Sequence, residues 1–142
     1  MSHPGEQICD ELVTTLNSAP TGTFALRFTA EKPADPNAEL DKASDAIRVL
    51  FWPHSESEKK IGRGNPTLET FSVAMLVIRK LSTEFTRERM HSVMREIKTY
   101  LRGRRMAGRV YSGAETTAVD LEQLHDRQRL AVATILTYTG TA

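Results

Sequence analysis

The sequence predicts an α+β fold in which two helices pack on a single antiparallel or mixed β-sheet of about four or five strands. Three observations lead to this prediction. The closing stretch 130–138 alternates between two largely apolar faces, as a strand inside a sheet does. Two further stretches, 4–18 and 87–101, repeat apolar residues at the spacing of an amphipathic helix. The predicted order is helix, three strands, helix, an optional short strand and a last strand.

The N-terminal part contributes a helix and a strand. Pro4 is typical of a first helical turn, and the apolar positions then repeat every three or four residues at Ile8, Cys9, Leu12, Val13 and Leu16. Polar residues with Pro20 and Gly22 end the helix. The following stretch 24–30 alternates apolar and polar residues, which predicts a half-buried strand.

The middle of the chain contains the two strands expected at the centre of the sheet. Residues 47–52 are a compact apolar run that ends at Pro53. Residues 54–66 are polar and contain two glycines, so we expect a loop there. The stretch 67–80 is the longest strand candidate, because apolar residues alternate along it with a period of two.

The last third begins with the second helix. Its apolar stripe consists of Met90, Val93, Met94, Ile97 and Leu101, and Gly103 is expected to end it. Residues 103–126 look irregular, with short strands expected near 109–111 and 118–121. The closing strand should place Leu130, Val132, Thr134, Leu136 and Tyr138 on one face, against the stripe of the second helix.

Length and charge indicate one domain with separated charges. A chain of 142 residues is expected to form a single domain, residues 1–142, with mobile loops near 31–44, 54–66 and 103–126. The net charge is only +1, yet residues 1–58 carry ten acidic and four basic side chains. Residues 59–112 carry thirteen basic and four acidic ones. Such segregation fits head-to-tail packing of like subunits, an anionic partner, or simply a solvated surface.

The residue pattern predicts no enzyme, no cofactor and no metal site. Cys9 is the single cysteine, so no intrachain disulfide can form. The four histidines are scattered, and the one cluster of histidine with carboxylates, at 120–126, is more typical of a polar loop than of a metal site. No apolar run approaches a membrane span and no signal peptide is visible, so we expect folding in the cytosol and no membrane partner.

The basic middle of the chain is the strongest functional candidate. One or two cations beyond a helix end complement its dipole, but this chain has more than that requirement explains. The surplus indicates contact with an acidic protein surface or with nucleic acid phosphates. Aromatic residues are sparse among these cations, which argues against a stacking platform for single strands. The candidate interface or lumen residues are Lys59, Lys60, Arg63, Arg102, Arg104, Arg105 and Arg109.

The order of elements resembles the tail terminator proteins of long-tailed bacteriophages, also called tail-completion or tail-to-head joining proteins. The resemblance covers nearly the whole chain and is one of pattern, not of a signature motif. The matching segments are the helix Ile8–Leu16, the strand Thr23–Phe28, the apolar run Ala46–Pro53 after an acidic loop with prolines, the long strand Glu69–Ile78, the helix Arg87–Leu101 and the end of the last strand, Ile135–Thr139.

This resemblance implies a structural virion protein that is assembled in the host cytoplasm and resides in the tail or neck. It implies a homo-oligomeric ring, usually a hexamer, that caps the head-proximal end of the tail tube and stops its polymerisation. The implied partners are further copies of the chain, the tail tube protein and the head-tail connector or stopper protein. DNA would pass through the lumen without specific binding. A connector or stopper subunit remains an alternative, as does a small DNA-binding protein that uses the basic segments 59–63 and 102–109.

Overall fold

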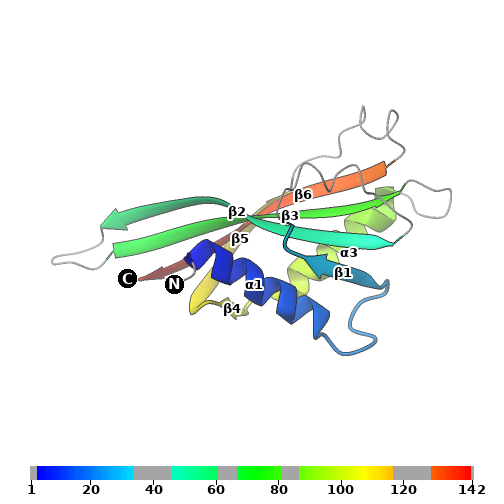
Figure 1. The fold of residues 1–142 in the computed structure, drawn as a ribbon, viewed down its shortest axis with the longest axis horizontal. Coiled ribbons are helices and arrows are strands. Elements are labelled where there is room, and N and C mark those ends of the chain that lie inside the picture. Colours follow the sequence, from blue (N-terminus) through cyan, green and yellow to red (C-terminus); the bar gives the residue numbers. More distant parts are fainter. Residues whose placement is uncertain (1–2, 34–45, 61–66, 81–86, 117–128, 142) are drawn as a thin grey trace.

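The computed structural model describes residues 3–33, 46–60, 67–80, 87–116 and 129–141. In that part of the chain, two helices and six strands form one α+β unit (Figure 1). The predicted class is therefore confirmed, whereas the expected strand number of four or five is wrong, because the sheet has six. The elements are α1 (Pro4–Asn17), β1 (Phe28–Glu31), β2 (Ile47–Lys60), β3 (Thr67–Lys80), α3 (Arg87–Leu101), β4 (Arg105–Met106), β5 (Arg109–Thr116) and β6 (Arg129–Thr141).

The six strands form one mixed sheet in the order β1-β2-β3-β6-β5-β4. The pair β1–β2 is parallel, and all other neighbours are antiparallel. The closing strand β6 lies between β3 and β5, so the end of the described chain is built into the middle of the sheet. This placement explains why both of its faces are largely apolar.

Both helices pack on one face of the sheet and form the main core. The predicted stripes of α1 and α3 are buried there, except for Val13, which is half-buried, and so are the alternating residues of β2, β3 and β6 on this face. Val132, Leu136 and Tyr138 of β6 have no exposed surface, as the period-two pattern predicts. The buried Thr134 hydroxyl lies 3.0 Å from the Met94 sulfur, which ties β6 to α3. We call this side of the sheet the helix face.

The opposite face of the sheet carries a second, smaller cluster over the same part of the strands. Leu50, Leu76 and Ile78 are buried in it, and Trp52 packs against them. We call this side the outer face. Its apolar residues stop where β2 reaches Pro53, and beyond that point the character of the sheet changes.

The segment expected to be a loop at 54–66 begins instead as a strand. β2 continues to Lys60 and remains paired with β3 down to the pair Lys60–Thr67. A register shift between Pro53 and Ser55 makes His54 an extra residue, a β-bulge, that turns the following side chains over. Residues 61–66, which include Arg63, lie outside the described residues. The two strands extend beyond the helices as an arm (Figure 1).

The other differences from the expected elements concern lengths. β1 begins at Phe28, because Phe24 instead packs its ring against Phe28 and Tyr100 from an irregular segment. β5 runs to Thr116, well beyond the short strand expected at 109–111. The strand expected at 118–121 and most of the loop expected at 31–44 lie outside the described residues. Gly103 does end α3, with φ +82°, as expected.

Candidate subunit interface

The distal arm, defined as His54–Lys60 of β2 and Thr67–Thr70 of β3, is the most exposed part of the sheet. All seven residues of its β2 half are exposed, and the four of its β3 half are half-buried. Within the described chain β1 flanks β2 only from Ile47 to Leu50, so the outer edge of the arm has no strand beside it. Open edges are places where other chains pair, and charged residues and a bulge are the usual protections against it.

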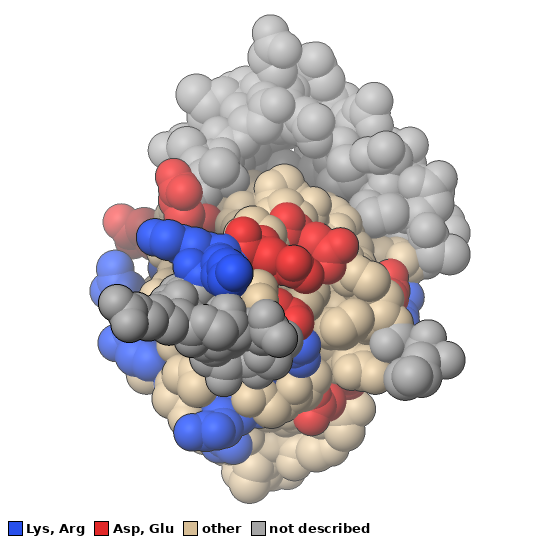
Figure 2. Space-filling view, turned by 90° about the vertical axis from the view of Figure 1, so that its left-hand side faces the viewer, with Lys and Arg blue, Asp and Glu red and all other residues tan. Residues whose placement is uncertain are grey.

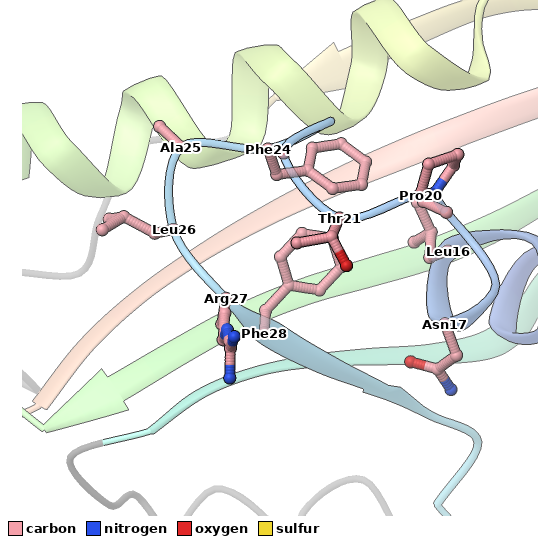
Figure 3. A pocket seen from close by; sticks show the side chains of 11 residues that line it. Leu16, Asn17, Pro20, Thr21, Phe24, Ala25, Leu26, Arg27 and Phe28 are labelled. Carbon is pink, nitrogen blue, oxygen red and sulfur yellow. The ribbon is translucent and has the colours of Figure 1, made fainter.

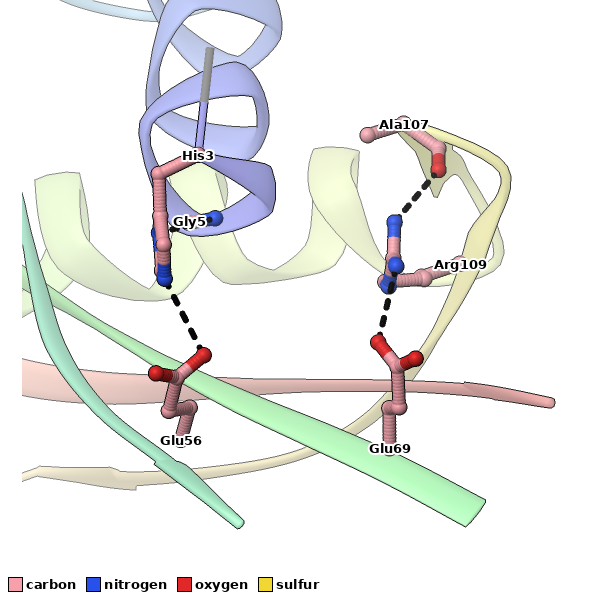
Figure 4. A network of polar contacts seen from close by, with 6 residues as sticks. All are labelled: His3, Gly5, Glu56, Glu69, Ala107 and Arg109. Carbon is pink, nitrogen blue, oxygen red and sulfur yellow. Dashed lines mark hydrogen bonds and ion pairs between the residues drawn. The ribbon is translucent and has the colours of Figure 1, made fainter. Parts of the chain in front are cut away.

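Two polar contacts fasten the base of the arm to the rest of the fold (Figure 4). His3 caps the N-terminus of α1, with its Nδ1 accepting the Gly5 amide at 3.0 Å. This leaves Nε2 as the protonated nitrogen, which donates to Glu56 Oε2 at 3.0 Å. The His3 ring also meets the edge of Phe71. The start of the chain is thereby attached to the arm.

The second contact connects β5 to the arm across β6. Arg109 donates to Glu69 Oε2 of β3 at 3.0 Å and to the Ala107 carbonyl at 3.0 Å, and its guanidinium covers the ring of Phe71. The side chain passes over Gly140 of β6, where a Cβ would lie 2.9 Å from Arg109 Cγ. A larger residue at this position would therefore force the Arg109 side chain to shift.

The two faces of the arm differ in chemistry. After the bulge, the helix face of β2 carries Glu56, Glu58 and Lys60. On the outer face the register aligns uncharged hydroxyl side chains across β2, β3 and β6. The sheet neighbour Val110 of β5, which is 44% exposed, borders them. We call this surface the hydroxyl face; its residues are Ser55, Ser57, Thr70, Ser72, Thr137 and Thr139.

The helix face of the arm holds two carboxylates directly opposite each other. Glu58 of β2 is the cross-strand partner of Glu69 of β3. Like charges at such positions are destabilising. Arg109 neutralises Glu69, but no described side chain pairs with Glu58. Figure 2, which views the molecule from the arm end, shows acidic side chains gathered in a patch beside basic ones.

The basic corner, defined as Arg102, Arg104 and Arg105, lies between the end of α3 and β4, at the opposite edge of the sheet. All three residues are exposed. Arg104 is held locally, because it donates to the Tyr100 carbonyl at 3.0 Å and its guanidinium lies 4.1 Å from the centre of the Tyr100 ring. Within the described chain no carboxylate pairs with any of the three.

The predicted basic block is therefore divided into three parts. Lys59 and Lys60 lie at the far end of the arm, and the basic corner lies four strands away. Four strand spacings amount to about 19 Å along the sheet. Arg109 is engaged inside the chain by Glu69 and Phe71. Arg63 lies outside the described residues.

Three acids of the described N-terminal part, Glu6, Asp10 and Glu31, are paired with cations of the same chain. Lys32 reaches both Glu6 and Asp10 of α1, at 2.9 and 2.8 Å. Hydrogen bonds to Asp10 and Glu6 raise the pKa of Lys32 above its ordinary value. Arg48 pairs with Glu31 at 2.8 Å. Among the described acids of this region, these pairs leave fewer carboxylates for a partner than the sequence count indicates.

The remaining features of the described chain, a surface hollow and a buried thiol among them, do not suggest a catalytic or metal-binding site. A hollow of about 470 Å³ lies between the end of α1 and the segment 19–28 (Figure 3), and among its lining residues only Arg27 is charged. Burial, followed by the charge of Glu6, raises the pKa of the Cys9 thiol to about 12. Among the residues described, no group of three histidine, cysteine or acidic side chains is placed to hold a metal ion. Their helices are also too short or too polar to cross a membrane.

Glu58 and the hydroxyl face were not among the predicted site residues, although the sequence contains a signal for the hydroxyl face. Hydroxyl residues recur with a period of two at Ser55 and Ser57, at Thr70 and Ser72, and at Thr137 and Thr139. Period two in hydroxyls predicts a polar strand face as period two in apolar residues predicts a buried one. No signal of this kind shows that Glu58 and Glu69 are opposite each other, because their register depends on the bulge.

No family model and no curated protein matches the chain, so the function is inferred from the geometry described above.

Proposed function

We propose that this chain is a ring-forming structural subunit, and specifically a tail terminator that caps the head-proximal end of a phage tail tube and joins it to the head connector. The observation that carries the proposal is the distal arm. It is a regular, anchored extension of the sheet, and all seven of its β2 residues are exposed in the described chain. Such an element costs conformational entropy, which a contact with another subunit would offset.

A ring requires one surface of a subunit to meet a different surface of its neighbour. The arm and the basic corner lie at opposite edges of the sheet, which is the arrangement that such a heterologous contact needs. The ring number, which the resemblance gives as six, and the partners at either side of the ring belong to the proposal.

The hydroxyl face supports the passage of DNA through the ring without specific binding. A lumen that holds phosphates tightly would need several lysines or arginines, because phosphate contacts dominate DNA affinity. The six residues of the hydroxyl face carry no charge, and the cation nearest to them on β2 is Lys59. We therefore propose this face, and not the basic corner, as the surface turned toward the DNA.

The alternative of a small DNA-binding protein has less support. Lys59 and Lys60 lie in the arm and the basic corner lies at the opposite edge of the sheet, while Arg109 is paired with Glu69. A connector or stopper subunit of the neck would use the same kind of ring contact and stays an alternative to the terminator.

The test is to add the purified chain to tail tube protein that is polymerising and to measure tube length by electron microscopy. We expect shorter tubes with a ring of extra density at one end only. Tubes of unchanged length with bare ends would contradict the terminator. DNA binding that falls steeply with salt would favour the DNA-binding alternative instead.

A further inference from the structure

The acidic side of the arm and the basic corner are two charged surfaces that lack a counterpart within the described chain. Glu58 has no cationic partner and lies opposite another carboxylate, Glu69. Arg102 and Arg105 are exposed without an acidic partner, and each lies within three residues of the other. Glu58 and the two arginines carry opposite charges, so each could serve as the counterion of the other, although Lys60 shares the face of the arm with Glu58.

Within the described chain these two surfaces do not pair with each other. β2 and β4 are separated by β3, β6 and β5. Four strand spacings, about 19 Å measured along the sheet, separate β2 from β4. Each surface is therefore available to a second copy of the chain.

We propose that Glu58, at the helix face of the arm of one subunit, pairs with Arg102 and Arg105 in the basic corner of the next subunit. This inference rests on the proposed ring and assigns the contact that closes it. Glu56 is left out because His3 holds it, and Arg104 because Tyr100 holds it. The contact is head to tail: every subunit offers its arm to one neighbour and its corner to the other.

The free energy that this contact contributes to association is small. Exposed ion pairs are weak and are screened by salt, so they set the orientation of neighbours more than they hold them together. We expect loss of the contact to raise the concentration needed for self-association about tenfold, since two weak pairs are lost. Raising the ionic strength should produce a similar loss, because the Debye length shortens.

The test is a charge-swap experiment on the full chain, read by sedimentation velocity over a range of protein concentrations. Glu58→Arg alone and the pair Arg102→Glu with Arg105→Glu should each weaken association about tenfold. The variant that carries all three changes should associate nearly as the unchanged chain does, because the contact is then restored with reversed signs. The matched control is Glu11→Arg, an exposed acid of α1, which should leave association unchanged.

Folding and assembly can be separated in this design. Glu58→Arg places a cation opposite Glu69, so its resistance to urea should not fall. Single-site variants that associate normally, a triple variant that fails to recover, or a chain that stays monomeric at every concentration would each overturn the inference. A chain that caps tail tubes but ignores the charge swaps would overturn this contact and leave the terminator proposal standing.

Discussion

The two halves of the β2–β3 hairpin share the same hydrogen-bonded ladder and yet have opposite surroundings. In the body of the molecule, Val49, Phe51, Met75 and Val77 have no exposed surface. Beyond Pro53 the ladder continues through six further residue pairs, from Ser55–Ser72 to Lys60–Thr67, and every β2 residue in these pairs is exposed. Strand pairing therefore does not depend on core formation here, because the backbone hydrogen bonds between β2 and β3 extend beyond the apolar core.

A two-stranded ribbon alone is marginally stable in water. The arm is therefore supported from the sides: β6 pairs with β3 as far as Leu68, and the contacts of His3 and Arg109 secure its base. An extension that needs this much support and contributes little burial is expected to serve a contact outside its own chain.

The largest loss of folding stability is expected for a truncation in the body, the part of the sheet that the two helices cover. Leu136→Ala removes a fully buried side chain of β6 from the main core and should lower the free energy of unfolding by about 2–5 kcal/mol. The same truncation in the arm, Leu68→Ala, should cost less than about 1 kcal/mol because Leu68 is only half-buried. Urea unfolding followed by circular dichroism gives both values. Equal losses would remove the distinction between the body and the arm.

The second-largest loss of folding stability is expected at alkaline pH. Burial raises the pKa of the Cys9 thiol from its ordinary 9.0 to about 12. The folded thiol keeps its proton more firmly than the unfolded one, so its contribution is intact below about pH 9 and is lost as the pH rises toward about 12. The expected slope is up to about 1.4 kcal/mol per pH unit. Urea unfolding at several pH values should show a shallower decline in Cys9→Ala, and identical slopes would argue against a buried thiol.

A smaller effect is expected at the junction of the body and the arm. Gly140→Ala places a Cβ against Arg109 Cγ and should displace the Arg109–Glu69 pair, at a cost of about 1–2 kcal/mol. Gly113→Ala is the matched control, since a Cβ there meets nothing within 4 Å. Hydrogen exchange should locate the loss of protection at the distal ends of β3 and β5. A uniform loss over the whole sheet would mean that Arg109 supports the body as well.

The body could be predicted from sequence because one face of each element is buried. The stripe from Met90 to Leu101 and the face from Val132 to Tyr138 produce clear periods, and both are confirmed. The arm could not be predicted in this way, because a strand with solvent on both sides leaves no apolar period. At Phe24 the alternating pattern was present but misleading, since that ring packs from an irregular segment against Tyr100.

The candidate site was less predictable than the fold. Counting charges identified the basic residues but could not distinguish Arg105, which is exposed, from Arg109, which forms an ion pair with Glu69. The ten acids counted in residues 1–58 include Glu6 and Asp10, both of which Lys32 holds. Pairing across strands depends on register, and the register after His54 is set by a bulge that no sequence period reveals.

The closeness of the two ends of the chain has a practical consequence for every experiment above. His3 contacts Glu56, Thr141 pairs with Leu68, and both ends therefore lie at the arm (Figure 1). An affinity tag or fluorescent fusion on either end would crowd the surface whose role is in question. A cleavable tag that is removed before association is measured prevents the tag itself from altering the measured association.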